Sequence, residues 1–320
     1  MSRKLGSEIR NDSIGWAGIH GSSHARLNGM LWFLVAILGS AAYGLDYFVD
    51  KVFVSKYVKD PWTYYLWWGI YWFEACALLV IMYPAASAFN FWASLAGGVQ
   101  AIAATLYLRA ILREEVSRVA PFLYLSPLFS LVFSLLFLDE SIATTALLGI
   151  LILVAGAFLM GSREPWKLSL SAGAKLAILN AVMIGFYSVA LKLSTNVRGR
   201  LDVMFWTWLT YGIVVFVVAH RHLPTLVTEF RHMPRRVKAV LAGMVFVLVA
   251  ASASLIYAYS LADPPLVAAV SASSPLFVFL FTLAAGTLAP RLLKEDVGAR
   301  NMVSKLVGAM MIVLGVFLIS

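Results

Sequence analysis

The sequence contains ten long apolar runs, which constrain its fold more than any other feature. A hydrocarbon core about 30 Å thick requires ~20 mostly apolar residues in each spanning helix. Aliphatic, aromatic and cysteine residues make up 61% of the chain and charged residues only 13%, so a soluble protein of 320 residues is excluded. No run alternates polar and apolar residues as a membrane β-barrel requires. The expected helices span approximately 29–50, 61–83, 91–112, 117–138, 143–161, 173–193, 202–219, 238–260, 265–288 and 302–319.

The tetrapeptide Ser-Pro-Leu-Phe occurs twice, each time in the middle of an apolar run. Its prolines, Pro127 and Pro275, each follow an alanine by 17 residues, Ala110 and Ala258. Proline inside a helix removes a backbone donor and clashes with the preceding turn, and lipid tolerates this only where neighbouring groups satisfy the freed carbonyl. One such proline is ordinary, but the same motif in two corresponding places indicates a duplication. We expect the fourth and ninth helices to bend at these prolines.

Further echoes support the duplication, because Gly149 and Gly156 match Gly308 and Gly315. Five helices in each copy is an odd number, so the second copy is inverted relative to the first, as in many secondary transporters. The predicted fold is therefore all-α integral membrane, with ten transmembrane helices as two inverted five-helix repeats. The expected divisions are a polar N-terminal tail at 1–28, a first repeat at 29–161, a linker at 162–172 and a second repeat at 173–320.

One stretch resembles the EamA-type unit of the drug/metabolite transporter superfamily. The residues that carry the resemblance are Ala110-Ile111, Pro127 and Leu138-Asp139-Glu140. The family unit has Ala-Leu, a proline 17 residues later and a Leu-Gly-Glu end, so Asp139 replaces the usual glycine here. The second copy keeps Pro275 but lacks Leu-Gly-Glu. The resemblance covers roughly residues 30–319 and implies a ten-helix carrier that moves small metabolites by alternating access.

Charged residues inside the apolar runs are candidates for the substrate site, because an ionisable group in hydrocarbon costs ~2.5–3.5 kcal/mol on insertion scales. Glu74 and Asp46 are candidates for taking up a coupling proton or binding an ammonium group, and Arg109 for binding a carboxylate or phosphate. A structural Glu74–Arg109 pair is an open alternative. Asp46 and Asp50 lie one turn apart near a helix end, which favours the headgroup level over the centre.

Aromatic and small polar residues complete the predicted substrate site. Aromatic rings can stack on an apolar or cationic ligand, although lipid-facing packing is the alternative for each ring. The remaining predicted site residues are Tyr43, Tyr124, Pro127, Tyr187, Trp206, Ser274 and Pro275. We expect no catalytic residues, no metal site and no cofactor. Histidines lie only in the tail and in one link, Cys76 is alone, and no nucleotide-binding motif occurs.

The sequence thus predicts a secondary active transporter rather than an enzyme, multi-pass in the plasma or inner membrane. It would move an amino-acid-like or amphipathic metabolite, with efflux favoured over import. The expected partners are this small molecule, protons as a candidate coupling ion, the lipid bilayer and, as an open alternative, a second copy in a homodimer; nucleic acid is not expected. A membrane-embedded lipid-processing enzyme and a non-transporting scaffold or receptor are the competing interpretations.

The orientation of the chain in the membrane stays open. Lysine and arginine are more frequent in the links after the odd-numbered helices, which by the positive-inside rule places both termini outside. The family resemblance implies cytoplasmic termini. The identity of the substrate does not follow from the sequence either, because one fold can carry many ligands.

Overall fold

The computed structural model describes residues 30–50, 53, 57, 60–84, 88–114, 116–138, 142–161, 170–288 and 299–319. The predicted tail at 1–28 and most of the linker at 162–172 lie outside this part of the chain. After a first helix, Met30–Asp50, the elements are α2 (Pro61–Met82), α3 (Phe91–Ile111), α4 (Val116–Leu123), α5 (Ser126–Phe137), α6 (Thr144–Gly161), α7 (Ala172–Val197), α8 (Arg200–Ala219), η2 (His220–His222), α9 (Leu223–His232), α10 (Arg235–Leu261), α11 (Pro264–Ser271), α12 (Ser274–Leu288) and α13 (Ala299–Ile319).

The predicted all-α membrane class is confirmed. The described residues contain helices and no strands, and eight of the helical segments are long and apolar enough to cross a membrane. Two shorter apolar helices, Thr144–Met160 and Val303–Ile319, correspond to the fifth and tenth predicted spans. Local capping sets several of the helix starts. The Asp60 carboxylate accepts from the amide of Trp62 at 3.1 Å, and the Asn90 side chain accepts from the amide of Ala93 at 3.1 Å.

The fourth and ninth predicted helices are each interrupted at the repeated tetrapeptide. Helix α4 ends at Leu123 and α5 begins at Ser126, whereas α11 ends at Ser271 and α12 begins at Ser274. Each proline therefore occupies the second residue of a new helix, where its missing N–H is not needed. The predicted bends are present, but as breaks between two half-helices rather than as kinks in continuous ones.

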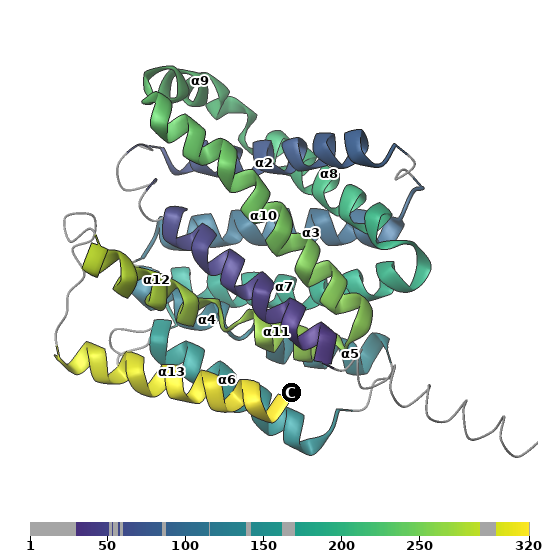
Figure 1. Cartoon of the computed structure of the whole chain (residues 1–320), viewed down its shortest axis with the longest axis vertical. Coiled ribbons are helices and arrows are strands. Elements are labelled where there is room, and N and C mark those ends of the chain that lie inside the picture. The colour runs from purple at the N-terminus through teal and green to yellow at the C-terminus, as the bar shows by residue number, and fades with distance from the viewer. Residues whose placement is uncertain are drawn as a thin grey trace, which may run out of the picture.

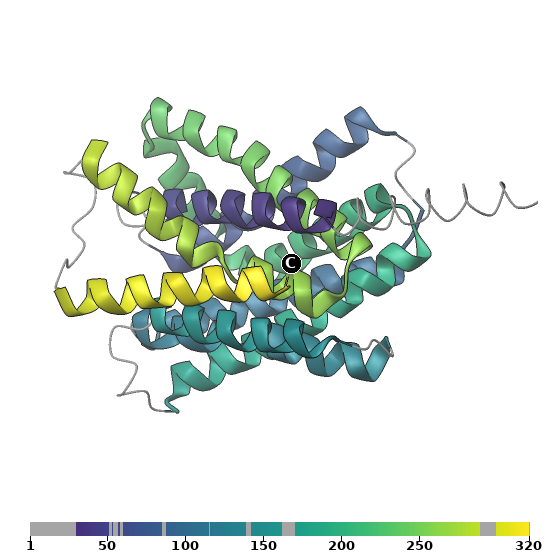
Figure 2. The same cartoon turned by 60° about the horizontal axis from the view of Figure 1, so that its bottom comes forward.

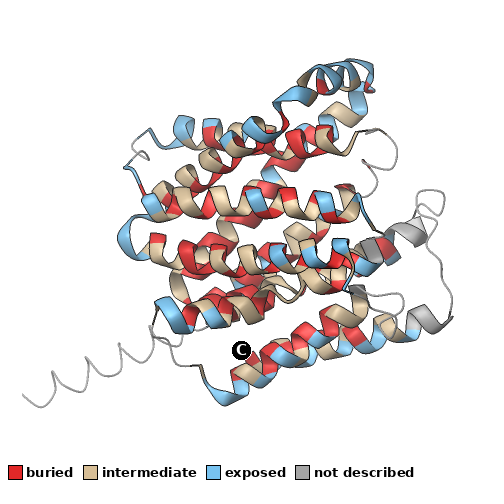
Figure 3. Ribbon diagram, turned by 180° about the vertical axis from the view of Figure 1, so that it is seen from behind, coloured by how far each residue is buried: buried red, intermediate tan, exposed pale blue. Residues whose placement is uncertain are grey.

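One predicted link contains a helix. The segment between the expected spans 202–219 and 238–260 was predicted as a link without a helix. Instead, α9 begins at Leu223 and tolerates Pro224 in its first turn, whereas Pro234 directly precedes α10. A proline stops a helix only when it lies beyond the first turn. Helix α9 projects at one end of the bundle (Figure 1), and exposed residues predominate along it (Figure 3).

The two shorter helices pack against each other along their length, as Figures 1 and 2 both show. A Cβ on Gly149 would lie 2.8 Å from the carbonyl oxygen of Gly315, and one on Gly156 would lie 2.7 Å from that of Gly308. Helices α6 and α13 are therefore antiparallel, with their backbones in contact. In the duplication Gly149 corresponds to Gly308 and Gly156 to Gly315. Gly149 therefore contacts the counterpart of Gly156, and Gly156 contacts the counterpart of Gly149.

A second pair of contacts follows the same rule. A Cβ on Gly44, in the first helix, would lie 2.5 Å from the Cβ of Phe277 in α12. A Cβ on Gly185, in α7, would lie 2.6 Å from the Cβ of Phe129 in α5. Gly44 corresponds to Gly185 and Phe129 to Phe277, so the repeats exchange equivalent contacts. Exchange of this kind is what a two-fold axis produces, and the antiparallel α6–α13 pair places that axis across the helices.

Replacing Gly156 by alanine should lower the melting temperature of the protein in detergent, because the added methyl group meets the Gly308 carbonyl at 2.7 Å. Overpacking of this kind costs about 1–3 kcal/mol, more than the ~1 kcal/mol that alanine gains over glycine in a helix interior. Gly243 in α10 is the matched control, since nothing lies within 4 Å of its added Cβ. Gly243→Ala should leave the melting temperature equal or higher, and an equal drop for both variants would contradict the packing account.

Candidate functional site

Two carboxylates of the first helix are buried inside the bundle. Asp46 is 4% exposed and Asp50 is 9% exposed, and the two interact electrostatically one helical turn apart. This is a deeper burial than their position near a helix end indicated. Lipid-facing and headgroup-level residues keep exposed surface in a single chain, whereas these two side chains are enclosed by protein.

Aromatic donors from α2 hold the Asp50 carboxylate. The Tyr64 hydroxyl donates a short hydrogen bond to its Oδ2 atom, and Trp68 also lies in hydrogen-bonding reach. The two aromatic rings pack edge to face, with their centroids 4.8 Å apart. Trp68 in turn stacks on Tyr107 of α3 at 6.3 Å. Asp50 is therefore oriented by side chains that are themselves fixed by packing.

Tyrosines of the first repeat lie beside the two carboxylates, and tyrosines of the second repeat lie next to those. We call this group the tyrosine cluster; its members are Tyr43, Tyr47, Tyr64, Tyr107, Tyr124, Tyr187, Tyr211 and Tyr259. Tyr43 and Tyr47 stack on each other at 6.1 Å and interact electrostatically with Asp46. Tyr187 interacts with Tyr47 and Tyr259, so the second repeat reaches the first helix directly.

The two carboxylates have no counter-charge in the described chain. Among the residues of known position, neither Asp46 nor Asp50 forms an ion pair with a lysine or arginine. Burying two carboxylates without a cation is strongly unfavourable, and hydrogen bonds from tyrosine only partly offset the cost. Chemically, the cluster can therefore hold a proton or the cationic group of a ligand, with ring faces available for cation–π contact.

Several predicted site residues are brought together here. Asp46, Tyr43, Tyr124 and Tyr187 all belong to this centre. Tyr124 lies in the break between α4 and α5.

The other predicted residues at the breaks, Pro127, Ser274 and Pro275, lie at the starts of α5 and α12, and Ser274 contacts the first helix. A Cβ on Gly44 would lie 3.2 Å from the carbonyl oxygen of Ser274. The Ser40 hydroxyl donates to the carbonyl of Val270 at 3.0 Å, which ties the first helix to the end of α11. Half-helix ends of this kind surround the ligand in many secondary transporters.

Three predicted residues lie elsewhere. Glu74 is exposed on α2 and Arg109 is exposed near the end of α3, with no ion pair between them among the described residues. The Arg109 guanidinium lies 5.9 Å from the ring centroid of Trp62 instead. Trp206 donates its indole N–H to the carbonyl of Ala88 at 3.0 Å, in the link between α2 and α3. None of the three contacts the tyrosine cluster in the described structure.

Sequence reasoning missed Tyr64 and Tyr259 as site residues. A signal for Tyr64 was present, because Tyr64, Trp68 and Tyr71 recur at a spacing of four and three residues and so share one helix face. The Asp46–Asp50 spacing of four is the matching signal on the first helix. No comparable pattern marks Tyr259, whose place depends on how α10 packs.

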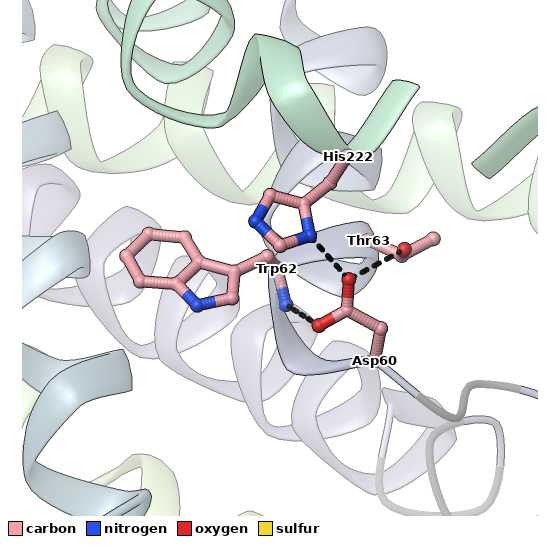
Figure 4. A network of polar contacts seen from close by, with 4 residues as sticks. All are labelled: Asp60, Trp62, Thr63 and His222. Atoms are coloured by element: carbon pink, nitrogen blue, oxygen red, sulfur yellow. Dashed lines mark hydrogen bonds and ion pairs between the residues drawn. The ribbon is translucent and has the colours of Figure 1, made fainter. Parts of the chain in front are cut away.

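Side-chain contacts also join the repeats at both ends of the bundle. At the end where α2 begins, His222 Nδ1 lies 2.5 Å from Asp60 Oδ2, and its ring stacks on Trp62 at 5.8 Å (Figure 4). At the opposite end, where α3 begins, the Asn90 side chain donates to the carbonyl of Ser194 at 3.0 Å. The Asp60–His222 contact uses the same carboxylate that caps α2, so it fixes the end of α8 to the start of α2.

Comparison with known families decides what this architecture is. Residues 30–162 match the family model of the EamA-like transporter family. These residues form an EamA-like transporter unit. The resemblance to the drug/metabolite transporter superfamily is thereby confirmed for this part of the chain. The described apolar helices on both sides of residue 162 agree with a multi-pass membrane protein.

Comparison with solved structures extends the likeness beyond the EamA-like unit. Among curated proteins, none matches this sequence. A solved crystal structure, described only as that of a protein, aligns with a TM-score of 0.62 at 18% identity. The alignment covers 88% of this chain and 94% of the other. At this identity the likeness shows the fold alone, but it includes both halves of the chain.

The described residues of the EamA-like unit and its counterpart contain no group of three or more His, Cys, Asp or Glu side chains that could hold a metal ion. Asp46 and Asp50 are two carboxylates without a third ligand of this kind. The site therefore offers tyrosine hydroxyls, ring faces and a carboxylate pair. This chemistry suits recognition of an organic cation or a proton better than coordination of a metal.

Replacing Tyr64 by phenylalanine should destabilise the protein by about 1–3 kcal/mol, because the buried Asp50 carboxylate then loses a hydrogen-bond donor. Tyr83→Phe is the matched control, since that tyrosine is 54% exposed just beyond α2. In the double variant with Asp50→Asn, the Tyr64→Phe effect should shrink, which a cycle of melting temperatures measures. Full additivity of the two changes would contradict a direct Tyr64–Asp50 bond.

Proposed function

We propose that this chain is a secondary active transporter that binds the cationic group of a small amphipathic metabolite at Asp46 and Asp50, in exchange for protons. The observation that carries the proposal is the carboxylate pair, 4% and 9% exposed, with Tyr43 and Tyr47 beside Asp46 and with Tyr187 of the second repeat next to Tyr47. A buried acid pair without a described counter-ion favours an ammonium group or a proton at the same place. Competition between the two for one site is the simplest way to couple their fluxes.

The tyrosine cluster supports a ligand with an apolar part. Aromatic faces attract a desolvated cation by roughly 2 kcal/mol or more, and they also pack on hydrocarbon. Tyr47 is 50% exposed although Asp46, Tyr107 and Tyr124 lie near it, so part of its side-chain surface is not covered by the described protein. An amphipathic amine satisfies the carboxylates and the rings together, whereas an anion would be repelled by Asp46 and Asp50.

The arrangement of contacts between the repeats supports alternating access. In this mechanism the two repeats rock about a fixed site, which opens to one side at a time. The Asp60–His222 contact joins α2 to the end of α8 on one side of the carboxylate pair, and the Asn90–Ser194 contact joins α3 to α7 on the other. A rocking motion must break one of these contacts while the other is kept.

Direction and location complete the proposal. We place the transporter in the cell membrane and assign it export, the direction often found among the carriers that its motifs resemble. The half-helix breaks at Pro127 and Pro275 lie beside the first helix and α7, where small shifts change the shape of the site. We infer that these breaks line the path of the ligand.

A matched set of six-carbon ligands tests the charge preference of the site. In melting experiments on the purified protein, hexylamine should stabilise the native chain, whereas hexanoate and hexan-1-ol should not. A ligand at 100 times its dissociation constant adds about 2.7 kcal/mol, which shifts the melting temperature by several degrees. Asp46→Asn and Asp50→Asn should each abolish the shift and lower hexylamine flux in proteoliposomes at least ten-fold.

Glu74→Gln is the matched control, because Glu74 is a carboxylate in a membrane helix but is exposed on α2. This variant should keep both the hexylamine shift and the flux. Loss of flux in Glu74→Gln with normal flux in Asp46→Asn and Asp50→Asn would place the cation site on the exposed face of α2 and overturn the proposal. Equal stabilisation by hexanoate would overturn the proposed charge preference.

Locking the Asp60–His222 contact should stop transport. In a Cys76→Ala background, Asp60→Cys and His222→Cys place two thiols where side chains meet at 2.5 Å. A short bifunctional thiol reagent should lower hexylamine flux at least five-fold, because the two repeats then stay joined at that end. A reducible reagent allows recovery after reduction, and the uncrosslinked double variant and each single variant serve as controls. Undiminished flux in the fully crosslinked protein would exclude a rocking motion at this end.

A further inference from the structure

A cavity lies at the end of the bundle opposite to the Asp60–His222 contact. It has a volume of about 520 Å³ and opens where α2 and α10 end and α8 begins. Its lining residues are Tyr83, Gly199, Arg200, Leu201, Asp202, Met204 and Tyr257. None of them belongs to the tyrosine cluster, so the cavity is separate from the site proposed for transport. Its volume falls within the ~300–1,000 Å³ that is usual for small-molecule sites.

Arg200 is held in one orientation in the wall of this cavity. Its guanidinium carbon lies 4.2 Å from the ring centroid of Tyr257, in a stacked cation–π contact. Its Nε atom donates to the hydroxyl of Ser260 at 2.7 Å, and that hydroxyl donates to the carbonyl of Tyr257 at 2.6 Å. The Ser260 hydroxyl thus accepts one hydrogen bond from Arg200 and donates one to Tyr257, so each proton has a single acceptor. This arrangement fixes the guanidinium plane but uses only the Nε–H.

The two terminal amino groups of Arg200 have no hydrogen-bond partner among the described residues. Within the described residues, Arg200 forms no ion pair, and Asp202 in the same cavity wall pairs with no basic side chain. The cavity therefore presents a fixed positive group and a separate negative group that do not neutralise each other directly. Two donors in one plane suit the two oxygens of a carboxylate or a phosphate, and a free carboxylate suits an ammonium group.

We propose that this cavity binds a zwitterionic amphiphile, with its oxyanion on Arg200 and its ammonium group at Asp202. The apolar part packs on Leu201, Met204 and Tyr83, which supply the hydrocarbon surface of the wall. The opposite charges disfavour a dianion or a simple cation, because a dianion is repelled by Asp202 and a cation by Arg200. Two sources share this chemistry, an aminophospholipid headgroup and a water-soluble zwitterion. The inference stands independently of transport.

Equilibrium dialysis of the purified protein in maltoside detergent tests the charge preference. Norleucine, hexanoate and hexylamine share a six-carbon chain. Norleucine carries both charges, hexanoate carries only the negative charge and hexylamine only the positive charge. The native chain should bind norleucine at least ten-fold more tightly than hexanoate at this cavity. The Asp46→Asn/Asp50→Asn double variant should keep norleucine binding, since it removes only the separate cation site. Failure of the proposed transport function would therefore leave this result unchanged.

Variants in the cavity wall give the decisive comparison. Arg200→Gln should weaken norleucine binding at least ten-fold, and Ser260→Ala should weaken it a few-fold, because the guanidinium then loses its anchor. Asp202→Asn should remove the preference for norleucine over hexanoate. Arg198→Gln is the control, since Arg198 is exposed two residues away and does not line the cavity. Melting temperatures of the variants report whether each one is folded.

Norleucine binding unchanged in folded Arg200→Gln, or hexanoate bound by the native chain as tightly as norleucine, would overturn the proposal. Nanodiscs then identify the source of the natural ligand. In one outcome, phosphatidylethanolamine competes with norleucine and phosphatidylglycerol does not, and native mass spectra show that Arg200→Gln no longer retains phosphatidylethanolamine. The site then takes a lipid headgroup. If phosphatidylethanolamine does not compete, a water-soluble zwitterion is the ligand, and the dependence on Arg200 still supports the site.

Discussion

Backbone contact between equivalent helices is the constraint on which this architecture depends. Lipid offers no hydrophobic force to hold apolar helices together, so close packing at small residues has to supply much of the association. At Gly44, Gly185, Gly149 and Gly156, an added Cβ would lie 2.5–2.8 Å from an atom of another helix. Because these contacts are exchanged between the two repeats, they fix the repeats as an antiparallel pair and leave little freedom in how the halves meet.

The same packing builds the site. Gly44 and Gly185 draw the first helix and α7 against the half-helices that begin at Ser274 and Ser126. Asp46 lies two residues after Gly44, and Tyr187 lies two residues after Gly185, so both side chains stand within one helical turn of these contacts. The bundle interior is therefore aromatic and acidic, with Asp50 held by Tyr64. Asp46 and Asp50 have no basic partner among the described residues, so a cation would complement the charge of this interior.

The helices could be predicted from the sequence because their signals are local. Run length, proline and capping residues such as Asp60 and Asn90 act within a few residues of where they stand. The site was harder to predict because α2 is apolar on all sides, and lipid-facing surfaces are as apolar as the interior. The periodicity of apolar residues in α2 therefore does not show which face of the helix points into the bundle. Glu74 was selected as a charge in an apolar run, yet it lies on the exposed side, while Tyr64 and Tyr71 of the same helix are buried.

The sequence by itself determined an all-α membrane protein, the approximate ends of most of its apolar helices and the interruptions at Pro127 and Pro275. These follow from composition and from short-range backbone chemistry, which do not depend on the rest of the chain. Only the tertiary structure decided that Asp46 and Asp50 are buried, that Tyr187 of the second repeat lies next to Tyr47 of the first helix, and that Arg200 is stacked on Tyr257. Such contacts join residues far apart in the chain, and the rotation of each helix about its own axis, which packing alone sets, decides whether they form.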